Sequence, residues 1–313
     1  MALTLVEAAK LETGDIYRRG VIETFAKSAG VLRVLPFEGI AGNALKYNRE
    51  ETLPGIGFRG VNEAYPESTG ILNPVTEPLV IAGGDLDVDK FIIDTMGENQ
   101  RTVQENMKIK ALALSWERTF FKGDQTTQAR EFDGLQVRVT GNQLINATGD
   151  DAPTAGGDPL SLFMLDALIG KVSDPTHIFL SKAMSQRLTQ AARNKEVGGF
   201  IVWDKDEFGR QIAFYNGLPL VTIDNDNNDE PILGFNEVGP GGGAPVTTSI
   251  YVVSLGDGAL SGIQNQDIDV RDLGELESKP AFRTRVEWYS GIAIFHGKSV
   301  ARLRGLKNAP VVV

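Results

Sequence analysis

The stretch ALKYNREETLPGIGFRGVNEAY, residues 44–65, is typical of extended chain on both sides of a glycine-rich bend, and it carries charges where a core face needs apolar side chains. An isolated two-stranded ribbon is only marginally stable, because it buries little apolar surface. We therefore expect a long arm that is stabilised by lying on something else. Another subunit is the surface that we expect it to cover.

Within this stretch, GIGFRG (residues 55–60) matches the dinucleotide-binding pattern G-x-G-x-x-G letter for letter. The pattern works only as a strand, a tight turn and then a helix, because the helix N-terminus must face the pyrophosphate. The following residues 61–78 contain three prolines and no helical apolar period. Each proline inside a helix costs about 3 kcal/mol. No helix is expected to start at Gly60, which argues against a nucleotide site.

The composition excludes several classes of site. The chain has 313 residues, of which 42% are apolar and 23% charged, as in globular proteins. It has no cysteine, which excludes disulfides, thiolate catalysis and cysteine-bound metals, and His177 and His296 are its only histidines. No basic leader precedes an apolar segment, and no apolar run approaches the roughly 18–20 residues that cross a bilayer. We expect a soluble protein made in the cytoplasm, with no membrane partner.

Charge is unevenly spread along the chain, whose net charge is -10. Residues 204–275 are strongly acidic, whereas residues 279–307 carry seven lysines and arginines against Glu287 alone. The overall acidity argues against tight duplex binding, which requires cationic groups to displace phosphate counterions. We interpret the basic segment as a set of partners for acidic neighbours in an assembly.

The clearest helix is expected over residues 95–123, with Thr95 and Glu98 as a capping box and Gly123 as the stop. Such a helix is roughly 40 Å long and can act as a strut. A shorter amphipathic helix is expected over residues 14–32. The stripe of the long helix that we expect to face the core consists of Val103, Met107, Ala111, Leu114 and Phe121.

From Asp158 onward the pattern alternates between helix and strand. Asp158 is expected to cap a helix that runs to about Lys171, and Ser181 to cap another that runs through Arg193. Strands are expected at residues 177–181, 218–224 and 249–256, with a flexible loop at 239–245. RTRVEWYSGIAIF (283–295) alternates and then becomes apolar, as in a strand that enters a core. We expect this strand to share a domain with the long helix, and residues 150–275 to be inserted into that domain.

Three polar features are interpreted as structural. DNDNNDE (224–230) is rich in possible calcium ligands, but an EF-hand requires glycine at its sixth position and glutamate at its twelfth. Counted from Asp224, neither position holds the required residue. We therefore expect a solvated acidic turn, with a nonspecific cation site as the alternative. Asp85, Asp87 and Asp89 share one face of an extended segment and are assigned to a surface or interface. His177 is assigned a structural role. We therefore expect no catalytic residue, no metal and no cofactor.

A resemblance to a known family is carried by four segments: residues 35–70, ALALSWERTFFKGD (111–124), EFDGLQ (131–136) and residues 269–306. Together they closely resemble the major capsid proteins of tailed bacteriophages. These proteins share the Hong Kong phage (HK-ninety-seven-like) capsid fold, of class α+β. The similarity follows the order of the chain over nearly its whole length.

The resemblance implies a division of the chain into four parts. They are an N-terminal arm (1–41), an extended loop or β-hairpin arm over a neighbouring subunit (42–80), a peripheral domain with a long spine helix (81–149 and 276–313) and an axial domain (150–275). The axial tips would meet around five-fold and six-fold axes. Within the loop we expect Phe58, Arg59 and Glu63 to make intersubunit contacts, since aromatic and arginine side chains dominate interface energetics.

The function implied is structural rather than enzymatic. Pentamers and hexamers of this major capsid protein would form the icosahedral head of a virion, assembled in the host bacterial cytoplasm, and would enclose double-stranded DNA without sequence-specific binding. The partners implied are the protein itself, a portal, a decoration protein and a separate scaffolding protein, unless a scaffolding extension has been removed. An encapsulin-type nanocompartment is the nearest alternative. A nucleotide-dependent enzyme using Gly55–Gly60 is the alternative from another class.

Overall fold

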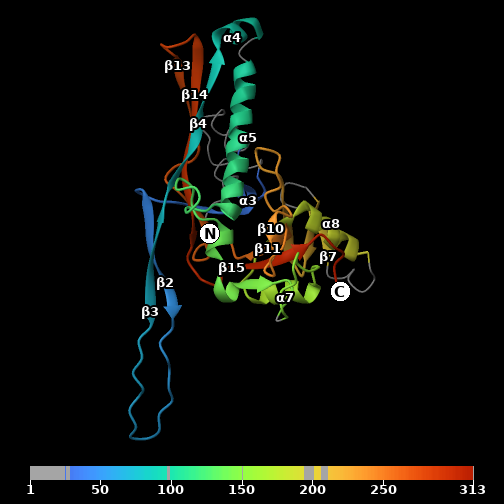
Figure 1. Ribbon diagram of the computed structural model, residues 1–313. Coiled ribbons are helices and arrows are strands. Elements are labelled where there is room, and N and C mark those ends of the chain that lie inside the picture. Colours follow the sequence, from blue (N-terminus) through green and yellow to red (C-terminus); the bar gives the residue numbers. More distant parts are fainter. Residues whose placement is uncertain are drawn as a thin grey trace.

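A computed structural model describes Phe25 and residues 29–96, 99–149, 151–193, 201–205 and 211–312. Two long projections extend from a central body in opposite directions (Figure 1). The lower projection is a hairpin of β2 (Ala44–Thr52) and β3 (Ile71–Pro78). The upper projection contains three long strands and two helices, α4 (Lys90–Met96) and α5 (Asn99–Lys122). Within the described residues, none of the helices has the length and apolar character needed to cross a bilayer.

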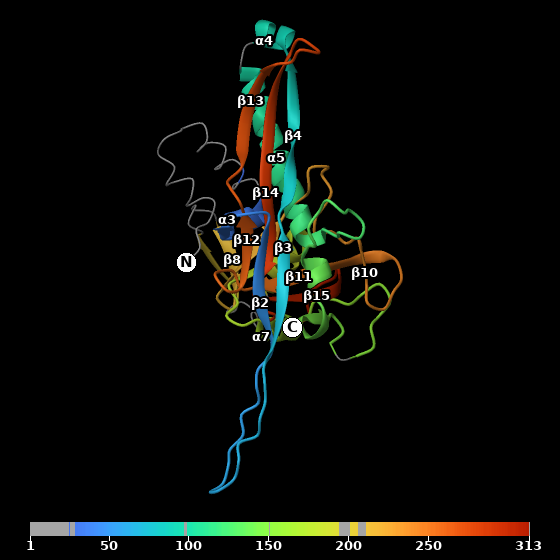
Figure 2. The same cartoon turned by 90° about the vertical axis from the view of Figure 1, so that its left-hand side faces the viewer.

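The upper projection is built around β14 (Ala281–Ile294), which pairs antiparallel with β4 (Val80–Asp89) on one side and β13 (Asp269–Glu275) on the other. α4 turns the chain at the tip, and α5 returns alongside the strands (Figure 2). In the body, β12 (Leu260–Gln264) and β1 (Phe37–Gly39) continue this five-stranded sheet.

One face of α5 forms the principal core. Ile109, Ala113, Trp116 and Phe120 are buried at the spacing of a helical stripe. The ring of Trp116 lies 5.4 Å from that of Trp288 on β14. Both indoles are satisfied as buried polar groups, because Trp116 Nε1 donates to the Ser290 hydroxyl at 3.0 Å and Trp288 Nε1 donates to a Gln264 side-chain oxygen at 3.1 Å.

The stripe predicted for this helix is largely wrong. Val103 and Met107 are 49% and 60% exposed, and among the predicted positions only Phe121 is fully buried. The buried residues Ile109, Ala113 and Trp116 follow the predicted ones by two positions, which is about 200° around an α-helix. Both faces of α5 carry apolar side chains, so its periodicity alone did not identify the face that packs on the sheet.

The ends of α5 also differ from the prediction. Thr95 lies inside α4, where its hydroxyl donates to the Phe91 carbonyl at 2.6 Å, and Glu98 lies outside the described residues, so this capping box is not observed. Gly123 follows the helix as expected but without a positive φ. A Cβ there would lie 2.2 Å from the Phe132 carbonyl oxygen. Close approach of the following turn, rather than a left-handed cap, requires the glycine.

The body contains a second sheet, which α6 (Leu135–Arg138) and the 3-10 turn η1 (Gly141–Gln143) connect to α5. Its eight strands are β5 (Leu144–Asn146), β15 (Val300–Lys307), β11 (Pro245–Val253), β6 (His177–Ser181), β9 (Leu218–Ile223), β8 (Gln211–Tyr215) and β7 (Ile201–Lys205) in spatial order, with β10 (Glu237–Val238) on β11.

β6 lies between β11 and β9 and is buried on both faces. Phe179 packs into the core formed with α5, whereas Ile178 and Leu180 pack into a second core with α7 (Leu162–Gly170) and α8 (Lys182–Ala191). This alternation follows from the period of two in a strand. The strand HIFLS was predicted with these bounds, and the Ser181 hydroxyl accepts from the Met184 amide at 3.2 Å, which confirms the predicted cap.

The cap predicted for the preceding helix is wrong. α7 begins at Leu162, and Asp158 instead joins β15, where its amide donates to the Gly305 carbonyl at 2.9 Å. Of the helix predicted over residues 14–32, most lies outside the described part of the chain. Phe25 is helical and buried, and a separate short helix, α3 (Gly30–Val34), begins at Gly30.

The strands are divided between the sheets differently from the expected domain boundaries. β12 and β13 (260–275) belong with β14, and β15 lies in the other sheet. The end of the predicted N-terminal arm is core, because Val31, Leu32 and Leu35 are fully buried. Both sheets pack on α5 and share its core. The chain can therefore pass from one sheet to the other while its apolar side chains stay buried, which is why the sheets do not follow the expected boundaries.

Candidate functional site: the hairpin arm

The hairpin arm is residues 44–78. Its strands pair antiparallel from Ala44 opposite Pro78 to Thr52 opposite Ile71. Beyond this pairing, residues 53–70 form the arm tip, which has no regular structure apart from a turn at Val61 and Asn62. Both views show the tip extending away from the body (Figures 1 and 2). No helix follows Gly60, as the prolines predicted, so the glycine pattern lacks the helix N-terminus that a pyrophosphate requires.

Apolar side chains are concentrated on this tip. Those with at least 65% of their surface exposed are Leu53, Ile56, Phe58, Val61 and Tyr65. Phe58 is fully exposed, at 102% of its reference area. Large exposed apolar side chains that lie close together are typical of interaction sites. The arm tip is therefore the candidate contact surface of the chain.

Two of the three predicted contact residues also hold the shape of the tip. The Gly60 amide donates to Glu63 Oε2 at 2.8 Å, and Arg59 Nη1 donates to the Glu63 carbonyl at 3.4 Å. The Arg59 guanidinium also lies 5.0 Å from the centre of the Tyr65 ring, within the range of a cation–π contact. Phe58, in contrast, presents its whole side chain to the outside.

A glycine of GIGFRG has a steric role at the tip. A Cβ at Gly57 would lie 2.5 Å from Pro66 Cγ on the returning chain. Across the arm, the Ser68 hydroxyl donates to the Gly55 carbonyl at 2.6 Å. Gly57 therefore allows the two extended segments to approach each other closely, which is the use of glycine wherever backbone must come near another group.

The root of the arm is fixed to the body at two points. Arg138 of α6 donates from both terminal nitrogens to the carboxylate of Glu77 on β3, with Nη2 to Oε2 at 2.8 Å. On β2, the Tyr47 hydroxyl donates to the Ile294 carbonyl at 2.9 Å, and its ring lies 4.7 Å from that of Phe295. Burial raises the pKa of Tyr47, with the charge of Glu77 adding to the shift. These contacts set the direction in which the arm leaves the body.

The basic segment 279–307 finds many of its acidic partners within the same chain. On the upper projection, Arg283 Nε lies 2.6 Å from Asp87 Oδ1, and Arg285 Nε lies 2.7 Å from Asp85 Oδ1. Lys279 also pairs with Asp87. The hydrogen bonds from Arg285 lower the pKa of Asp85, and those from Arg283 and Lys279 lower the pKa of Asp87.

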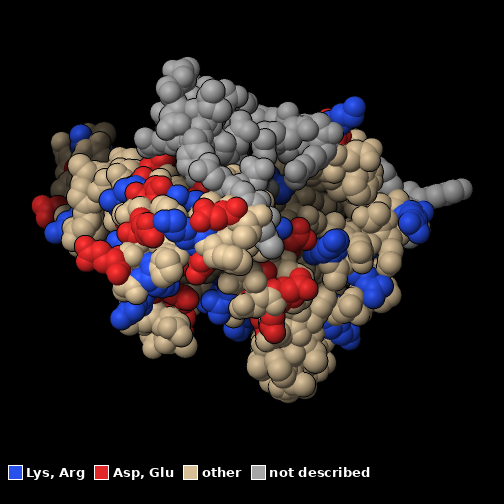
Figure 3. All heavy atoms as spheres, turned by 90° about the horizontal axis from the view of Figure 1, so that it is seen from above, with Lys and Arg blue, Asp and Glu red and all other residues tan. Residues whose placement is uncertain are grey.

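The expectation that the basic segment pairs across an assembly is therefore corrected for these residues. The strand register places the aspartates of β4 directly opposite the arginines of β14. Asp89 differs from the other two, because its carboxylate accepts from the Phe91 amide at 2.8 Å at the start of α4. Seen from above, positive and negative side chains alternate on the coloured surface instead of separating by sign (Figure 3).

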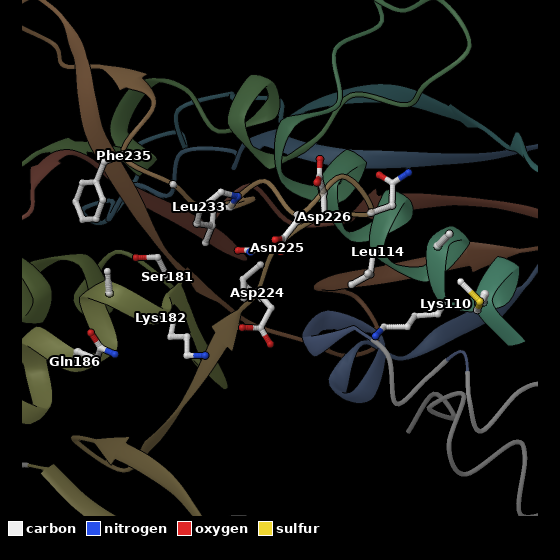
Figure 4. Close-up of a pocket in the computed structure, with 18 residues that line it drawn as sticks. Lys110, Leu114, Ser181, Lys182, Gln186, Asp224, Asn225, Asp226, Leu233 and Phe235 are labelled. Carbon is white, nitrogen blue, oxygen red and sulfur yellow. Dashed lines mark hydrogen bonds between the residues drawn. The ribbon is translucent and has the colours of Figure 1, made fainter.

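A groove of about 960 Å³ lies between α5, α8 and the loop that follows β9. Its apolar wall includes Met107, Ala111 and Leu114, the positions that were predicted to face the core. Figure 4 shows Asp224 between Lys182 and Lys110 across the opening. The second apolar face of α5 therefore lines this groove.

The acidic turn beside this groove is organised by its own hydrogen bonds. The Asp226 carboxylate accepts from the amides of Asn228 at 2.8 Å and Glu230 at 3.0 Å, and the Asn225 side-chain amide donates to Asp229 at 2.7 Å. Among the residues that the structure describes, no group of three or more histidine, aspartate or glutamate side chains could hold a metal ion. The arrangement is that of a structural turn.

Neither a family model nor a curated protein matches the sequence. Solved structures match it over most of its length. The encapsulin of the holo-SrpI complex from Synechococcus elongatus is 17% identical, with a TM-score of 0.64 over 100% of this chain and 99% of that chain. A structure from Mycobacterium phage Cain is 12% identical, with a TM-score of 0.62 over 91% of this chain and 90% of that chain.

The capsid of an empty GTA particle is 14% identical, with a TM-score of 0.61 over 89% of this chain and 90% of that chain. The chain has the Hong Kong phage capsid fold. This is the α+β fold that the resemblance implied. Two of these neighbours are an encapsulin and the capsid of a GTA particle.

Proposed function

We propose that the chain assembles with copies of itself, as pentamers and hexamers, into a closed icosahedral shell. The observation that carries the proposal is the exposed apolar surface of the arm tip, on which the Phe58 side chain is fully exposed. A hairpin that projects this far buries little surface on its own subunit, so its stabilisation has to come from a neighbour. Head-to-tail contacts of this kind close into rings when the rotation per subunit permits.

In this proposal the hairpin arm is the extended loop that covers an adjacent subunit. Phe58 is the apolar anchor, and Arg59 and Glu63 keep the tip in shape while presenting polar groups to the same neighbour. The upper projection and its sheet form the peripheral domain, with α5 as its spine. The eight-stranded sheet with α7 and α8 forms the axial domain, now including β15 and excluding β12 and β13.

We further propose that the shell is the head of a tailed bacteriophage and encloses double-stranded DNA. Several mycobacteriophage and GTA structures share the fold, which supports this assignment. The net charge of -10 also suits a wall along which DNA slides, because electrostatic affinity rises with the number of phosphates neutralised. The shell would assemble in the host bacterial cytoplasm, with a scaffolding protein, a portal and a decoration protein as partners, and would remain in the virion.

An encapsulin-type nanocompartment is the second candidate. The observation that favours it is the match to the Synechococcus elongatus encapsulin, which extends over 100% of this chain and 99% of that chain. The two candidates share the assembly mechanism and differ in what the shell contains.

The test is electron microscopy of the purified full-length chain, followed by analysis of what the particles contain. Closed icosahedral shells are expected, and their absence at high protein concentration would contradict the assembly proposal. Nuclease-protected double-stranded DNA in particles taken from the native source would support the phage head. A packaged protein in place of nucleic acid would support the nanocompartment.

A further inference from the structure

Glu117 is a buried carboxyl group at the junction between α5 and α3. It is 1% exposed, and its Oε1 accepts a hydrogen bond from the Val31 amide at 2.8 Å. Its other oxygen, Oε2, is buried without a hydrogen-bond partner. A charged carboxylate with one unsatisfied oxygen is expensive to bury, whereas the neutral acid is much less so. The site therefore favours a protonated Glu117.

α3 fits closely against this group. A Cβ at Gly30 would lie 3.2 Å from Glu117 Oε1 and 3.1 Å from the Thr222 carbonyl oxygen. Val31 and Leu32 are fully buried, and the Leu35 amide closes the helix by donating to the Val31 carbonyl at 2.9 Å. Glu117 thus binds the first turn of α3.

Burial is the largest influence on the pKa of Glu117. Burial raises the pKa of Glu117 to about 7, against the lowering effects of the Val31 and Gly30 amides and of Arg33 on α3. Asp224, which follows β9, raises it further. On α5 itself, the Arg118 guanidinium lies 3.6 Å from Glu131 and 3.9 Å from Asp226, so it is directed toward other carboxylates.

We propose that Glu117 is a proton-controlled clasp that attaches α3 to α5 more firmly when its carboxyl group is protonated. The sign follows from linkage. The pKa of Glu117 is raised from 4.5 to about 7 when α3 is docked, so the docked state binds the proton more tightly than a state with Glu117 in water. The attachment is strongest at acidic pH and weakens as the pH rises through about 7.

The test is amide hydrogen exchange of the full-length chain, corrected for the intrinsic exchange rate at each pH. The reporter is the Leu35 amide, and the Phe120 amide in the core of α5 is the internal reference. Between about pH 6 and pH 8, the protection factor of Leu35 should fall about ten-fold, because each pH unit between the two pKa values changes the docking equilibrium ten-fold. Phe120 should change much less.

Glu117→Gln carries a neutral group of the same shape and should make the Leu35 protection factor independent of pH. The matched control is Glu105→Gln, which changes a carboxyl group on the same helix that is also buried but lies 3.3 Å from Arg101. This control should keep the ten-fold change. If Glu117→Gln does not fold, the wild-type titration decides: the Leu35 protection factor should fall as the pH rises toward about 7 and should level off above it. A flat wild-type profile, an equal change at Phe120, or an unaltered profile in Glu117→Gln would overturn the proposal.

Discussion

Arg138 and Glu77, which are 61 residues apart in the sequence, form a two-point ion pair at the root of the hairpin arm. The Glu77 side chain is 9% exposed and that of Arg138 is 17% exposed, so little water screens the pair. Arg138 Nε also donates to the Asp133 carbonyl, which ties α6 and β3 to the turn after α5. The arm is thus anchored by a charge pair in which removing one partner would leave the other charge buried and unpaired.

Replacing Arg138 with methionine should destabilise the subunit by about 3 kcal/mol, because it leaves the Glu77 carboxylate buried and unpaired. Removing both charges, in the double variant Glu77→Met with Arg138→Met, should recover most of that loss. Urea unfolding followed by tryptophan fluorescence measures both differences. The interpretation would be wrong if Arg138→Met were as stable as the wild type.

Acid should weaken the upper projection. The pKa of Asp87 is lowered by its hydrogen bonds to Arg283 and Lys279, so its stabilising effect is present above the ordinary aspartate value and is lost as the pH falls through the lowered value. Asp87→Asn should therefore lower the thermal midpoint at neutral pH and reduce the dependence on acid. The effect should shrink in high salt because these groups are reached by solvent.

The control for this prediction is Asp94→Asn. Asp94 is an exposed aspartate on α4, at the end of the upper projection. It should leave the midpoint unchanged at neutral pH. Calorimetry at neutral pH and at about pH 3 compares the two variants with the wild type. Identical acid dependence in Asp87→Asn and the wild type would count against the role of the ion pairs.

The close approach at Gly123 gives a steric prediction. Because an added Cβ would lie 2.2 Å from the Phe132 carbonyl oxygen, Gly123→Ala should cost about 2 kcal/mol of unfolding free energy. Gly297→Ala is the matched control, since nothing lies within 4 Å of a Cβ at that position. Chemical denaturation of the pair should separate them clearly. Equal stability would show that the turn after α5 adjusts freely.

The sequence predicted those elements whose local pattern of residues is compatible with only one type of secondary structure. HIFLS has three consecutive apolar residues followed by Ser181, so both the strand and the Ser181 cap followed from local chemistry. The long helix was also expected, from apolar residues at helical spacing and the stop at Gly123, with bounds close to those of α5. The projecting arm followed from the shortage of apolar residues in its strands.

Other features depend on contacts between distant residues and could not be predicted from local pattern. α5 has two apolar faces, and contacts with distant residues such as Phe37 and Trp288 place Trp116 rather than Met107 in the core. The pairing of Asp87 with Arg283 depends on the register of β4 and β14. The Asp158 cap failed because its backbone pairs with β15, an interaction that outweighs the local preference for a helix start.

Substitutions at the arm tip should affect assembly without affecting the fold of the subunit. Phe58→Ala removes a fully exposed side chain, so urea unfolding of the subunit should be unchanged while the yield of shells falls. Phe58→Tyr is the matched control and should assemble nearly as the wild type does. Arg59→Glu should likewise reduce assembly, and Arg59→Lys should reduce it less. Sedimentation velocity measures the fraction of subunits in large particles.

The central claim is that identical subunits hold one another through the arm. Electron microscopy should compare the full-length chain with a variant in which a short glycine–serine turn replaces residues 53–70, under identical conditions. The account predicts closed shells from the full-length chain, and folded subunits that form none from the variant. Closed shells from the variant, in the same yield as from the full-length chain, would contradict it.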